Sequence, residues 1–313
     1  MLVLTAEQCS RVMMRATHPD ATLLPLLLTD GRYGLPDNVV NDPRHANVRT
    51  VLRQGTTVAD GSVTPVPLAE QGFYFTVDGK KMHLGFASGF NPLRGWPFPH
   101  HGPLEIVSPT MVRFEARYND DHLSYDWVNN RRRVELAQGD ETGPKMGDTF
   151  WTSWSNIFTD KRGPILVEDN QTVIHQWFHT GDGPFVYVSV GKGILEVATR
   201  SSTTPYTAHY TQPFNPATGT PQNFVIRGVL AEAGHLDVWL NGTQIVNVDA
   251  PLGFFNDPTP DDPAYLHIAS GIYQGNVTDR AVLYLANLEF GTTDLSARVT
   301  TPLPVTAPAG GWV

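Results

Sequence analysis

The stretch that decides the fold is Val173 to Val190, which reads VIHQWFHTGDGPFVYVSV. Apolar and polar residues alternate on both sides of a Gly/Asp/Pro turn at residues 180–184, a pattern typical of two β-strands joined in a hairpin. Side chains along a strand point alternately to its two faces. One face is expected to hold His175, Trp177 and His179, and the other Ile174, Gln176 and Phe178.

Polar side chains are therefore expected on both faces of this strand. A core strand normally has Val, Ile or Leu on at least one face, so a His-Gln-Trp cluster indicates a sheet surface that meets a ligand. The alternative is that Trp177 and the histidines form an ordinary buried aromatic layer.

The rest of the chain continues this strand pattern. Strands are expected at residues 73–77, 81–86, 110–118, 132–137, 149–158, 172–178, 185–190, 194–199, 222–230, 235–240, 244–248, 264–273 and 281–290. Asp78-Gly79 and Asn241-Gly242 are strong two-residue hairpin turns. No alternation of strands with helices and no fixed repeat is present. The sequence therefore predicts an all-β protein whose residues 66–299 form a two-sheet antiparallel β-jelly roll, a concanavalin-like sandwich.

Both ends differ from this body. Residues 1–65 are expected to form a small mixed extension, with one helix over Ala6 to Arg15 and a second helical stretch after Asp42-Pro43. We interpret this extension as an adaptor that meets a protein partner or a virus particle; the alternative is a packing elaboration of the main domain. Residues 300–313, rich in Pro, Ala and Gly, are expected to form an extended tail.

Composition narrows the class of partner. The chain has 313 residues, 22 Lys and Arg against 31 Asp and Glu, and a formal net charge of -9, which disfavours a nucleic-acid partner. Cys9 is the only cysteine, so no intrachain disulfide can form.

The leucine-rich run at 23–28 contains Pro25 and is too short to span a membrane. Glu7 and two arginines interrupt the region where a secretory signal would be apolar. We expect an extracellular or virion-associated protein without a recognisable signal peptide.

Metal-ligating patterns are weak. His100-His101 lies in a Pro/Gly-rich loop at residues 89–102 and has no third ligand nearby. The oxygen-rich stretches 119–121 and 257–262 have the composition that Ca²⁺ prefers but lack the spacing of a calcium loop, so ordinary acidic turns are favoured. No metal ligand is assigned, and Ca²⁺ is the one cofactor left open.

Several short motifs occur in an order that resembles the jelly-roll polysaccharide lyases of the heparin lyase I and glucuronan lyase type. The motifs are Val112-Arg113-Phe114-Glu115, Arg133-Val134-Glu135-Leu136, GDTFW at 147–151, VIHQW at 173–177, LDVWLNG at 236–242 and Ser270-Gly271-Ile272-Tyr273. The resemblance covers a little over half of the chain, and it depends on the shared order more than on any single motif.

The resemblance implies a chemistry. A lyase of this type removes the proton at C5 of a uronic acid, which requires a neutralised carboxylate, a base, and an acid for the departing oxygen. Carried over to this chain, Gln176 would contact the carboxylate, Arg133 would supply positive charge and Tyr273 would act as base and acid, with His175 beside them. A phenol ordinarily ionises near pH ~10, so a tyrosine base needs a cation next to it.

Further residues of the same motifs are expected to bind the substrate: Glu135, Trp177, His179, Trp151 and Arg113. Trp96, Trp151, Trp154, Trp177 and Tyr187 could form a platform for sugar rings, although several must be core residues. The run Arg131-Arg132-Arg133 is either a basic patch for an acidic glycan or a solvated turn that ends in one structural Arg-Glu pair.

The chain departs from the family at three positions. Phe178 stands where the family has a histidine, and Ser270 and Gln274 replace the lysine and arginine that flank the tyrosine motif. The sequence therefore leaves two hypotheses for the function. The first is cleavage of an acidic, uronic-acid polysaccharide by β-elimination. The second keeps the fold without the chemistry, as a glycan-binding or structural protein of a virus particle, such as a decoration, fibre or tail component.

Overall fold

A computed structural model describes residues 1–5, 26–27, 33–35, 56–57, 73–84, 104–116, 131–137, 144–159, 171–179, 182–202, 204–256, 266–275, 281–308 and 311–312. Several sequence predictions lie outside these residues: both N-terminal helices, Cys9, the loop at 89–102, and the acidic stretches at 119–121 and 257–262. Within the described residues, no helix has the length and apolarity needed to cross a membrane.

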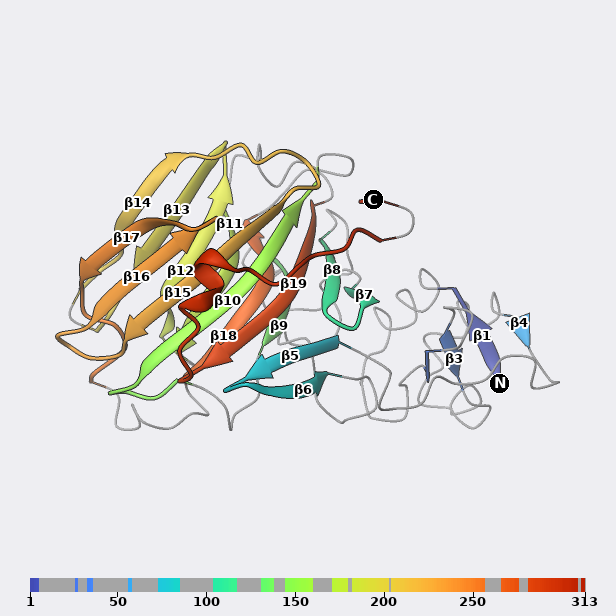
Figure 1. Cartoon of the computed structure of the whole chain (residues 1–313), viewed down its shortest axis with the longest axis horizontal. Helices are drawn as coiled ribbons and strands as arrows, with labels where there is room; N and C mark the ends of the chain where they lie inside the picture. The colour runs from blue at the N-terminus through green and yellow to red at the C-terminus, as the bar shows by residue number, and fades with distance from the viewer. Residues whose placement is uncertain are drawn as a thin grey trace.

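Two antiparallel sheets face each other in the main body (Figure 1). The larger runs in the order β17-β16-β15-β10-β19-β5-β6, with β8 also paired to β19 and β7 to β8. Its strands are β5 Phe73–Val77, β6 Lys80–Leu84, β7 Leu104–Ser108, β8 Met111–Ala116, β10 Thr149–Phe158, β15 Pro221–Val229, β16 His235–Leu240, β17 Thr243–Asp249 and β19 Ala281–Gly291. All its pairings are antiparallel except the short contact between β19 and β5.

The smaller sheet has six strands in the order β14-β13-β12-β11-β18-β9. They are β9 Arg131–Ala137, β11 Thr172–His179, β12 Gly183–Gly191, β13 Ile194–Thr199, β14 Thr207–Pro213 and β18 Leu266–Gly275. The stretch from Val173 to Val190 lies in β11 and β12, which pair as the predicted hairpin. This architecture confirms the predicted all-β, two-sheet antiparallel sandwich.

Two-residue turns join several neighbouring strands as the sequence predicts. Asp78 and Gly79 have φ of 45° and 76°, and Asn241 and Gly242 have φ of 49° and 82°. Left-handed backbone at both central residues matches the right-handed twist of the flanking strands, and Asn, Asp and Gly adopt it at least cost. These turns fix the registers of β5 with β6 and of β16 with β17.

The core lies between the two sheets and is rich in aromatic side chains. The rings of Phe150 and Trp177 meet edge to face, 5.4 Å apart, and Trp154 stacks on Phe224 at 5.0 Å. Trp177 is completely buried, and a Cβ at Gly228 would lie 2.5 Å from its ring. Since no side chain fits at that position, Gly228 is what lets β15 approach the large ring from β11.

The N-terminal extension contains strands that the sequence analysis did not predict. β1 Leu2–Leu4, β2 Leu26–Leu27, β3 Tyr33–Leu35 and β4 Thr56–Thr57 form a small antiparallel sheet in the order β2-β3-β1-β4. Each strand has only two or three residues, too few for an alternating pattern to stand out.

The C-terminal segment packs on the outer face of the nine-stranded sheet (Figure 1). After the short helix α5 Ala297–Thr300, the amide of Asn287 donates to the carbonyl oxygens of Leu303 and Pro304. Further along, the Trp312 ring meets Tyr284 edge to face at 5.1 Å. The tail predicted to be extended is therefore a strap along β19.

Candidate active site

The two faces of β11 have different surroundings. His175 and Trp177 point toward the nine-stranded sheet: the His175 ring stacks on Trp154 at 4.0 Å, and Trp177 Nε1 donates to Thr152 Oγ1 over 3.0 Å. Gln176, between them in sequence, therefore lies on the outer face of the six-stranded sheet. The predicted alternation holds for these three residues.

A β-bulge changes the face of one neighbour. Val173 pairs with Ser189 but His175 pairs with Val188, so Ile174 is an extra residue on β11. Ile174 is completely buried in the core cluster, on the same side as His175. The alternation in the sequence predicts Ile174 on the same face as Gln176, and that prediction is wrong because a bulge breaks the two-residue period.

Gln176 reaches across a neighbouring strand to a carboxylate. Its Nε2 donates to Glu135 Oε1 over 2.7 Å, from β11 over β18 to β9. The residues of β18 in this region are Ala269, which pairs with Gln176, and Gly271, which pairs with Glu135. Because neither has a long side chain, the amide and the carboxylate can meet above the sheet. The second Nε2 hydrogen of Gln176 stays available for another acceptor.

Tyr273 and Arg133 occupy paired positions next to this contact. Tyr273 is half-buried, and its Cα partners are Val173 on β11 and Arg133 on β9. Ile272 is in the core, so Tyr273 lies on the outer face with Gln176. From Val173 to Gln176 is three residues, or about 10 Å at ~3.3 Å per residue. The long side chains of Tyr273 and Gln176 can therefore reach groups on one sugar between them.

Polar residues continue over β12 and β13 on the same face. Val186, Val188 and Val190 are all core residues, so Tyr187 and Ser189 point outward. Tyr187 pairs with Gln176, and Ser189 pairs with Glu196 of β13.

Gln176 Oε1, Ser189 Oγ and Glu196 Oε1 are buried atoms of this face that have no hydrogen-bond partner among the described residues. Buried polar atoms are nearly always paired, because an unpaired one costs about 1–3 kcal/mol. Unpaired acceptors and donors gathered on one sheet face are typical of a surface that binds a polar ligand. We define the candidate site as Glu135, Gln176, Tyr187, Ser189, Glu196 and Tyr273, with Arg133 opposite Tyr273 in the register.

His175 lies away from this site, inside the sandwich. It is completely buried, and its Nδ1 is 2.6 Å from Ser270 Oγ of β18. Burial lowers the pKa of His175 to about 3, so the ring is neutral near pH 7. The structure does not bring His175 together with Gln176 and Tyr273; the ring instead links β11 to β18 and to Trp154.

Trp177 and His179, expected to bind substrate, also face inward. Trp177 is completely buried, and His179 is 1% exposed with its ring 5.4 Å from that of Phe254. His179 Nδ1 lies 2.9 Å from Asp182 Oδ2. The aromatic-layer alternative therefore describes the His175 and Trp177 side of β11, and the ligand-facing interpretation fits the Gln176 side.

Two other expected substrate residues lie on the nine-stranded sheet. Arg113 of β8 is buried and donates to Glu115 over 2.6 Å. Trp151 of β10 stacks on Trp239 at 6.2 Å, on the face away from the core residue Phe150. The sandwich separates both residues from Gln176, so they cannot contact the same sugar.

Three polar residues of the outer face were not predicted as site residues from the sequence. Ser189 and Glu196 had a signal, since each stands between two apolar residues of a strand. His267 of β18 lies between the core residues Leu266 and Ile268, and its ring is 4.8 Å from that of Phe178. An imidazole thus stands opposite Phe178, the position at which the chain lacks a histidine of the resembled family.

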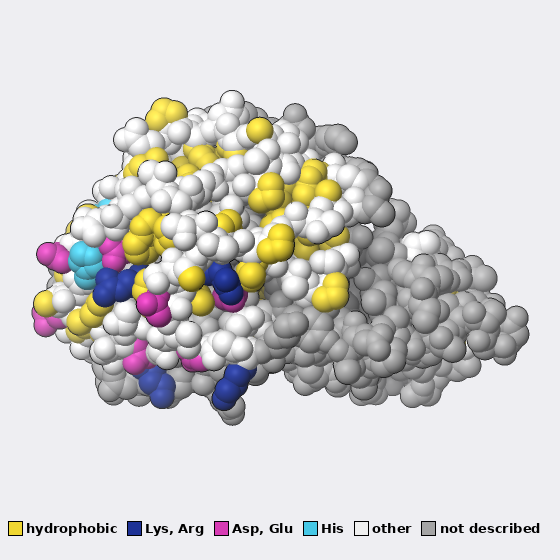
Figure 2. Space-filling view, in the orientation of Figure 1, with side chains coloured by type: hydrophobic (Ala, Val, Ile, Leu, Met, Phe, Trp, Pro, Cys, Tyr) yellow, Lys and Arg dark blue, Asp and Glu magenta, His cyan; other side chains and the backbone are white. Residues whose placement is uncertain are grey.

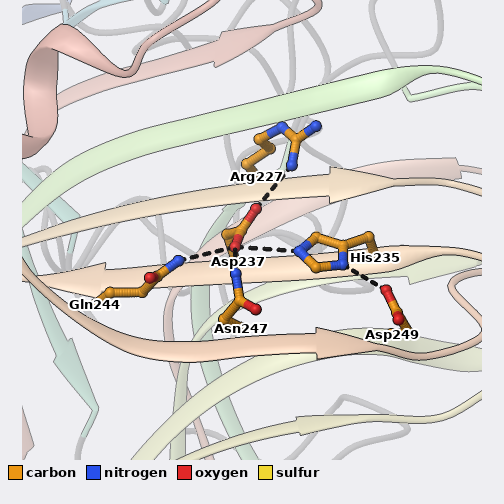
Figure 3. Close-up of polar contacts among 6 residues, drawn as sticks. All are labelled: Arg227, His235, Asp237, Gln244, Asn247 and Asp249. Atoms are coloured by element: carbon orange, nitrogen blue, oxygen red, sulfur yellow. Dashed lines mark hydrogen bonds and ion pairs between the residues drawn. The ribbon is translucent and has the colours of Figure 1, made fainter.

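A second polar cluster lies on the opposite side of the molecule, on β15, β16 and β17 (Figure 3). Asp237 accepts from Arg227 at 2.8 Å, Gln244 at 2.9 Å and Asn247 at 2.7 Å. His235 lies 3.2 Å from Asp237 and 2.7 Å from Asp249. Figure 2 shows basic, acidic and histidine side chains gathered at one end of the molecule. Because Asp237 is fully engaged, this cluster stabilises the three-stranded edge and leaves no buried acceptor for a ligand.

Replacing Asp237 by asparagine is expected to lower the free energy of unfolding by about 1–3 kcal/mol, because one buried acceptor then loses its charge toward Arg227. Urea unfolding followed by far-ultraviolet circular dichroism measures this change. Asp249→Asn is the matched control: that side chain is 95% exposed and should change stability by less than about 0.5 kcal/mol. Equal losses for the two variants would contradict the central role of Asp237.

The part of the chain that the structure describes contains no group of three His, Cys, Asp or Glu side chains placed to hold a metal ion. The acidic stretches considered for Ca²⁺ lie outside that part.

Comparisons with known proteins identify the family of the chain. A family model described as polysaccharide lyase matches residues 108–289. A search of curated protein sequences returned no match. Among solved structures, the chain is similar to the endo-β-1,4-glucuronan lyase of the fungus Trichoderma reesei, with 13% identity, a TM-score of 0.50, and coverage of 71% of this chain and 96% of that one. It is also similar to the alginate lyase AlgAT5 of Polysaccharide Lyase family 7, with 12% identity, a TM-score of 0.46, and coverage of 72% and 96%.

The glucuronan lyase comparison supports the jelly-roll fold. The matched segment 108–289 includes β8 to β18 and therefore every residue of the candidate site. Since the family model spans more than half of the 313 residues, the chain belongs to the polysaccharide lyase family.

Proposed function

We propose that this protein cleaves an acidic, uronic-acid polysaccharide by β-elimination on the outer face of the six-stranded sheet. The observation that supports this most directly is Gln176, whose amide is held by Glu135 while its Oε1 and one Nε2 hydrogen face no described partner. Family membership supplies the reaction class, and the residues on this face supply the groups that the reaction needs.

The reaction moves one proton and breaks one bond at the sugar. A base takes the proton from C5, the electron pair of that C–H bond forms a C4–C5 double bond, and the C4–O glycosidic bond breaks. An acid then protonates the departing oxygen. The negative charge that builds up on the C5 carboxylate group must be stabilised for the C5 proton to leave.

Each step has a candidate group on the outer face. The free Nε2 hydrogen of Gln176 donates to the uronate carboxylate. Tyr273 transfers the proton from C5 to the departing oxygen, because one hydroxyl can serve as base and then as acid on the same side of the sugar. Arg133, at the position of β9 that pairs with Tyr273, is the candidate source of positive charge for this step.

His175 has no proton-transfer role in this proposal. It is buried on the inner side of β11, so its contribution is to hold the strand that positions Gln176. Glu135 is a positioning residue as well, since it orients the Gln176 amide.

Gln176→Ala is expected to lower kcat/KM for elimination about 10- to 100-fold, the value of one hydrogen bond to a charged group. Elimination leaves a conjugated double bond, so the initial rate is followed by ultraviolet absorbance with a panel of uronic-acid polysaccharides. Gln244→Ala removes an amide from the opposite sheet and should leave the rate unchanged. A Gln176→Ala variant as active as the parent would contradict the assigned role.

The same experiment distinguishes the alternative function. If the folded parent protein binds a uronic-acid polysaccharide but forms no double bond with any of them, the domain is a glycan-binding protein and the elimination proposal fails.

A further inference from the structure

The candidate site extends beyond the groups that the elimination chemistry uses. Ser189 and Glu196 lie one and two strands from Gln176, and both are buried with an atom that lacks a described partner. Adjacent strands are about 4.8 Å apart, and Glu196 is also two residues, or about 6.6 Å, along β13 from Ala198, which is level with Gln176 through Tyr187. Glu196 therefore stands about 12 Å from Gln176, beside another sugar unit of the same polysaccharide chain.

Two tyrosines complete this region. Tyr187 lies between Gln176 and Glu196 on the sheet, and its ring stacks on Tyr206 at 5.9 Å. Tyr206 is 48% exposed, the one large hydrophobic side chain in the described residues with such exposure. An exposed aromatic ring beside polar groups suits the apolar face of a pyranose ring.

The side chains of Tyr187, Tyr206 and Glu196 interact with one another. Burial raises the pKa of Tyr187 above its usual range, and Tyr206 and Glu196 add to the effect. Burial, together with Glu196, likewise raises the pKa of Tyr206. Both phenols therefore remain protonated near neutral pH, and Glu196 Oε1 remains an acceptor that needs a donor.

The open Oε1 of Glu196 selects the chemistry of its ligand. A sugar hydroxyl can donate a hydrogen bond to a carboxylate, whereas a uronate carboxylate cannot and would be repelled. Arg200, the cation that acts on Tyr187, lies with its guanidinium over the Phe254 ring at 5.4 Å, and its buried Nε has no hydrogen-bond partner among the described residues. A uronate carboxylate placed against Glu196 Oε1 would face a negative oxygen.

We propose that Tyr187, Ser189, Glu196 and Tyr206 form a subsite for an uncharged sugar next to the uronate position at Gln176. The preferred substrate is then a heteropolysaccharide in which uronic acids are separated by neutral sugars, in place of a continuous polyuronate. This inference rests on the proposed elimination function for its location, and on the unpaired atoms and exposed ring for its specificity.

The test compares a homopolymer of uronic acid with a polymer that alternates uronic acid and a neutral hexose. The parent protein should show a kcat/KM at least about tenfold higher on the alternating polymer, the value of one hydrogen bond to a charged group. Glu196→Gln replaces the carboxylate by an amide that can donate to a carboxylate, so this preference should fall by about tenfold. Glu232→Gln, at an exposed carboxylate between β15 and β16, should change neither rate.

Binding is measured separately, so that the subsite and the chemistry can fail independently. Calorimetric titration of the Tyr273→Phe protein with short oligosaccharides from both polymers should show the same preference and the same loss of it in Tyr273→Phe/Glu196→Gln. Tyr206→Ala should weaken binding of the alternating oligosaccharide about tenfold, the contribution of one stacked ring and its hydroxyl.

Equal affinity for the two oligosaccharides, or a preference that Glu196→Gln leaves intact, would overturn the subsite even if elimination is observed. Absence of elimination with the binding preference intact would overturn only the proposed reaction.

Discussion

Replacing Tyr273 by phenylalanine is expected to lower kcat for elimination by about 10²–10⁴-fold, the usual contribution of a positioned acid or base. The phenylalanine ring can occupy the same half-buried place on β18, at the position that pairs with Val173 of β11 and with Arg133 of β9. Because the change deletes only the hydroxyl, KM should stay within a few fold of the parent value. The readout is the initial rate of double-bond formation on a uronic-acid polysaccharide.

Tyr210→Phe is the matched control for this experiment. Tyr210 of β14 is half-buried and packs against the core of the same sandwich, so its variant loses a hydroxyl without touching the candidate site. Both variants should unfold at nearly the parent temperature. A Tyr273→Phe protein with parental kcat would show that another group transfers the proton, and His267 on the same strand would be the next candidate.

The strands and several turns could be predicted because their signals are local. Asp78-Gly79 and Asn241-Gly242 require left-handed backbone, and few other residue pairs accept it. β14 was missed since its sequence TAHYTQP is polar and its residues are mostly exposed, as in an edge strand without a buried face. β7, with five residues, was missed next to a Pro/Gly-rich loop.

The composition of the candidate site could be predicted only in part, because it depends on which strands are neighbours. Gln176 and Glu135 are 41 positions apart and meet only because β18 lies between β11 and β9. Nothing local in either segment indicates that order. The motif order of the resembled family named Gln176, Glu135, Arg133 and Tyr273 together, and the register then places all four on adjoining strands.

Which face of β11 is the core face could not be decided from the sequence. His175 and Trp177 have aromatic rings with a nitrogen that can form a hydrogen bond. The other face has a polar side chain, Gln176, and an aromatic one, Phe178, so neither face is clearly the apolar one. The choice is made by the opposite sheet, where Thr152 accepts from Trp177 and Trp154 stacks on His175. The sequence likewise does not show which sheet contains Trp151 or which face it occupies. Its neighbour Phe150 faces the core, so Trp151 lies on the outer face of the nine-stranded sheet, away from Gln176.

Burial of His175 makes the fold sensitive to acid. A histidine whose folded pKa is about 3, against an ordinary value of 6.5, binds its proton more readily in the unfolded chain. The unfolded state therefore holds more protons below about pH 6.5, and stability is fully present above that pH and is lost as pH falls toward about 3. At about 1.4 kcal/mol per pH unit, this one ring should remove about 2–3 kcal/mol of unfolding free energy between about pH 7 and about pH 4.5.

Other carboxylates and histidines also titrate in this range, so the contribution of His175 is isolated by comparison. His175→Phe/Ser270→Ala keeps a ring stacked on Trp154 and removes the partner hydroxyl together with the titrating group. Urea unfolding at the two pH values should show a smaller acid loss in this double variant than in the parent, by about the same 2–3 kcal/mol.

His235→Gln is the control, because the sign of its effect is opposite. The hydrogen bond to Asp249 raises the pKa of His235, so this group contributes stability at low pH that is lost as pH rises above its folded pKa. Its removal should leave the acid loss as large as in the parent or larger. The loss of unfolding free energy in acid could instead be the same in His175→Phe/Ser270→Ala as in the parent. That result would mean that the His175 ring reaches solvent before the chain unfolds. In that case β11, with Gln176 on it, opens locally in acid, and activity should fall at a higher pH than the fold is lost.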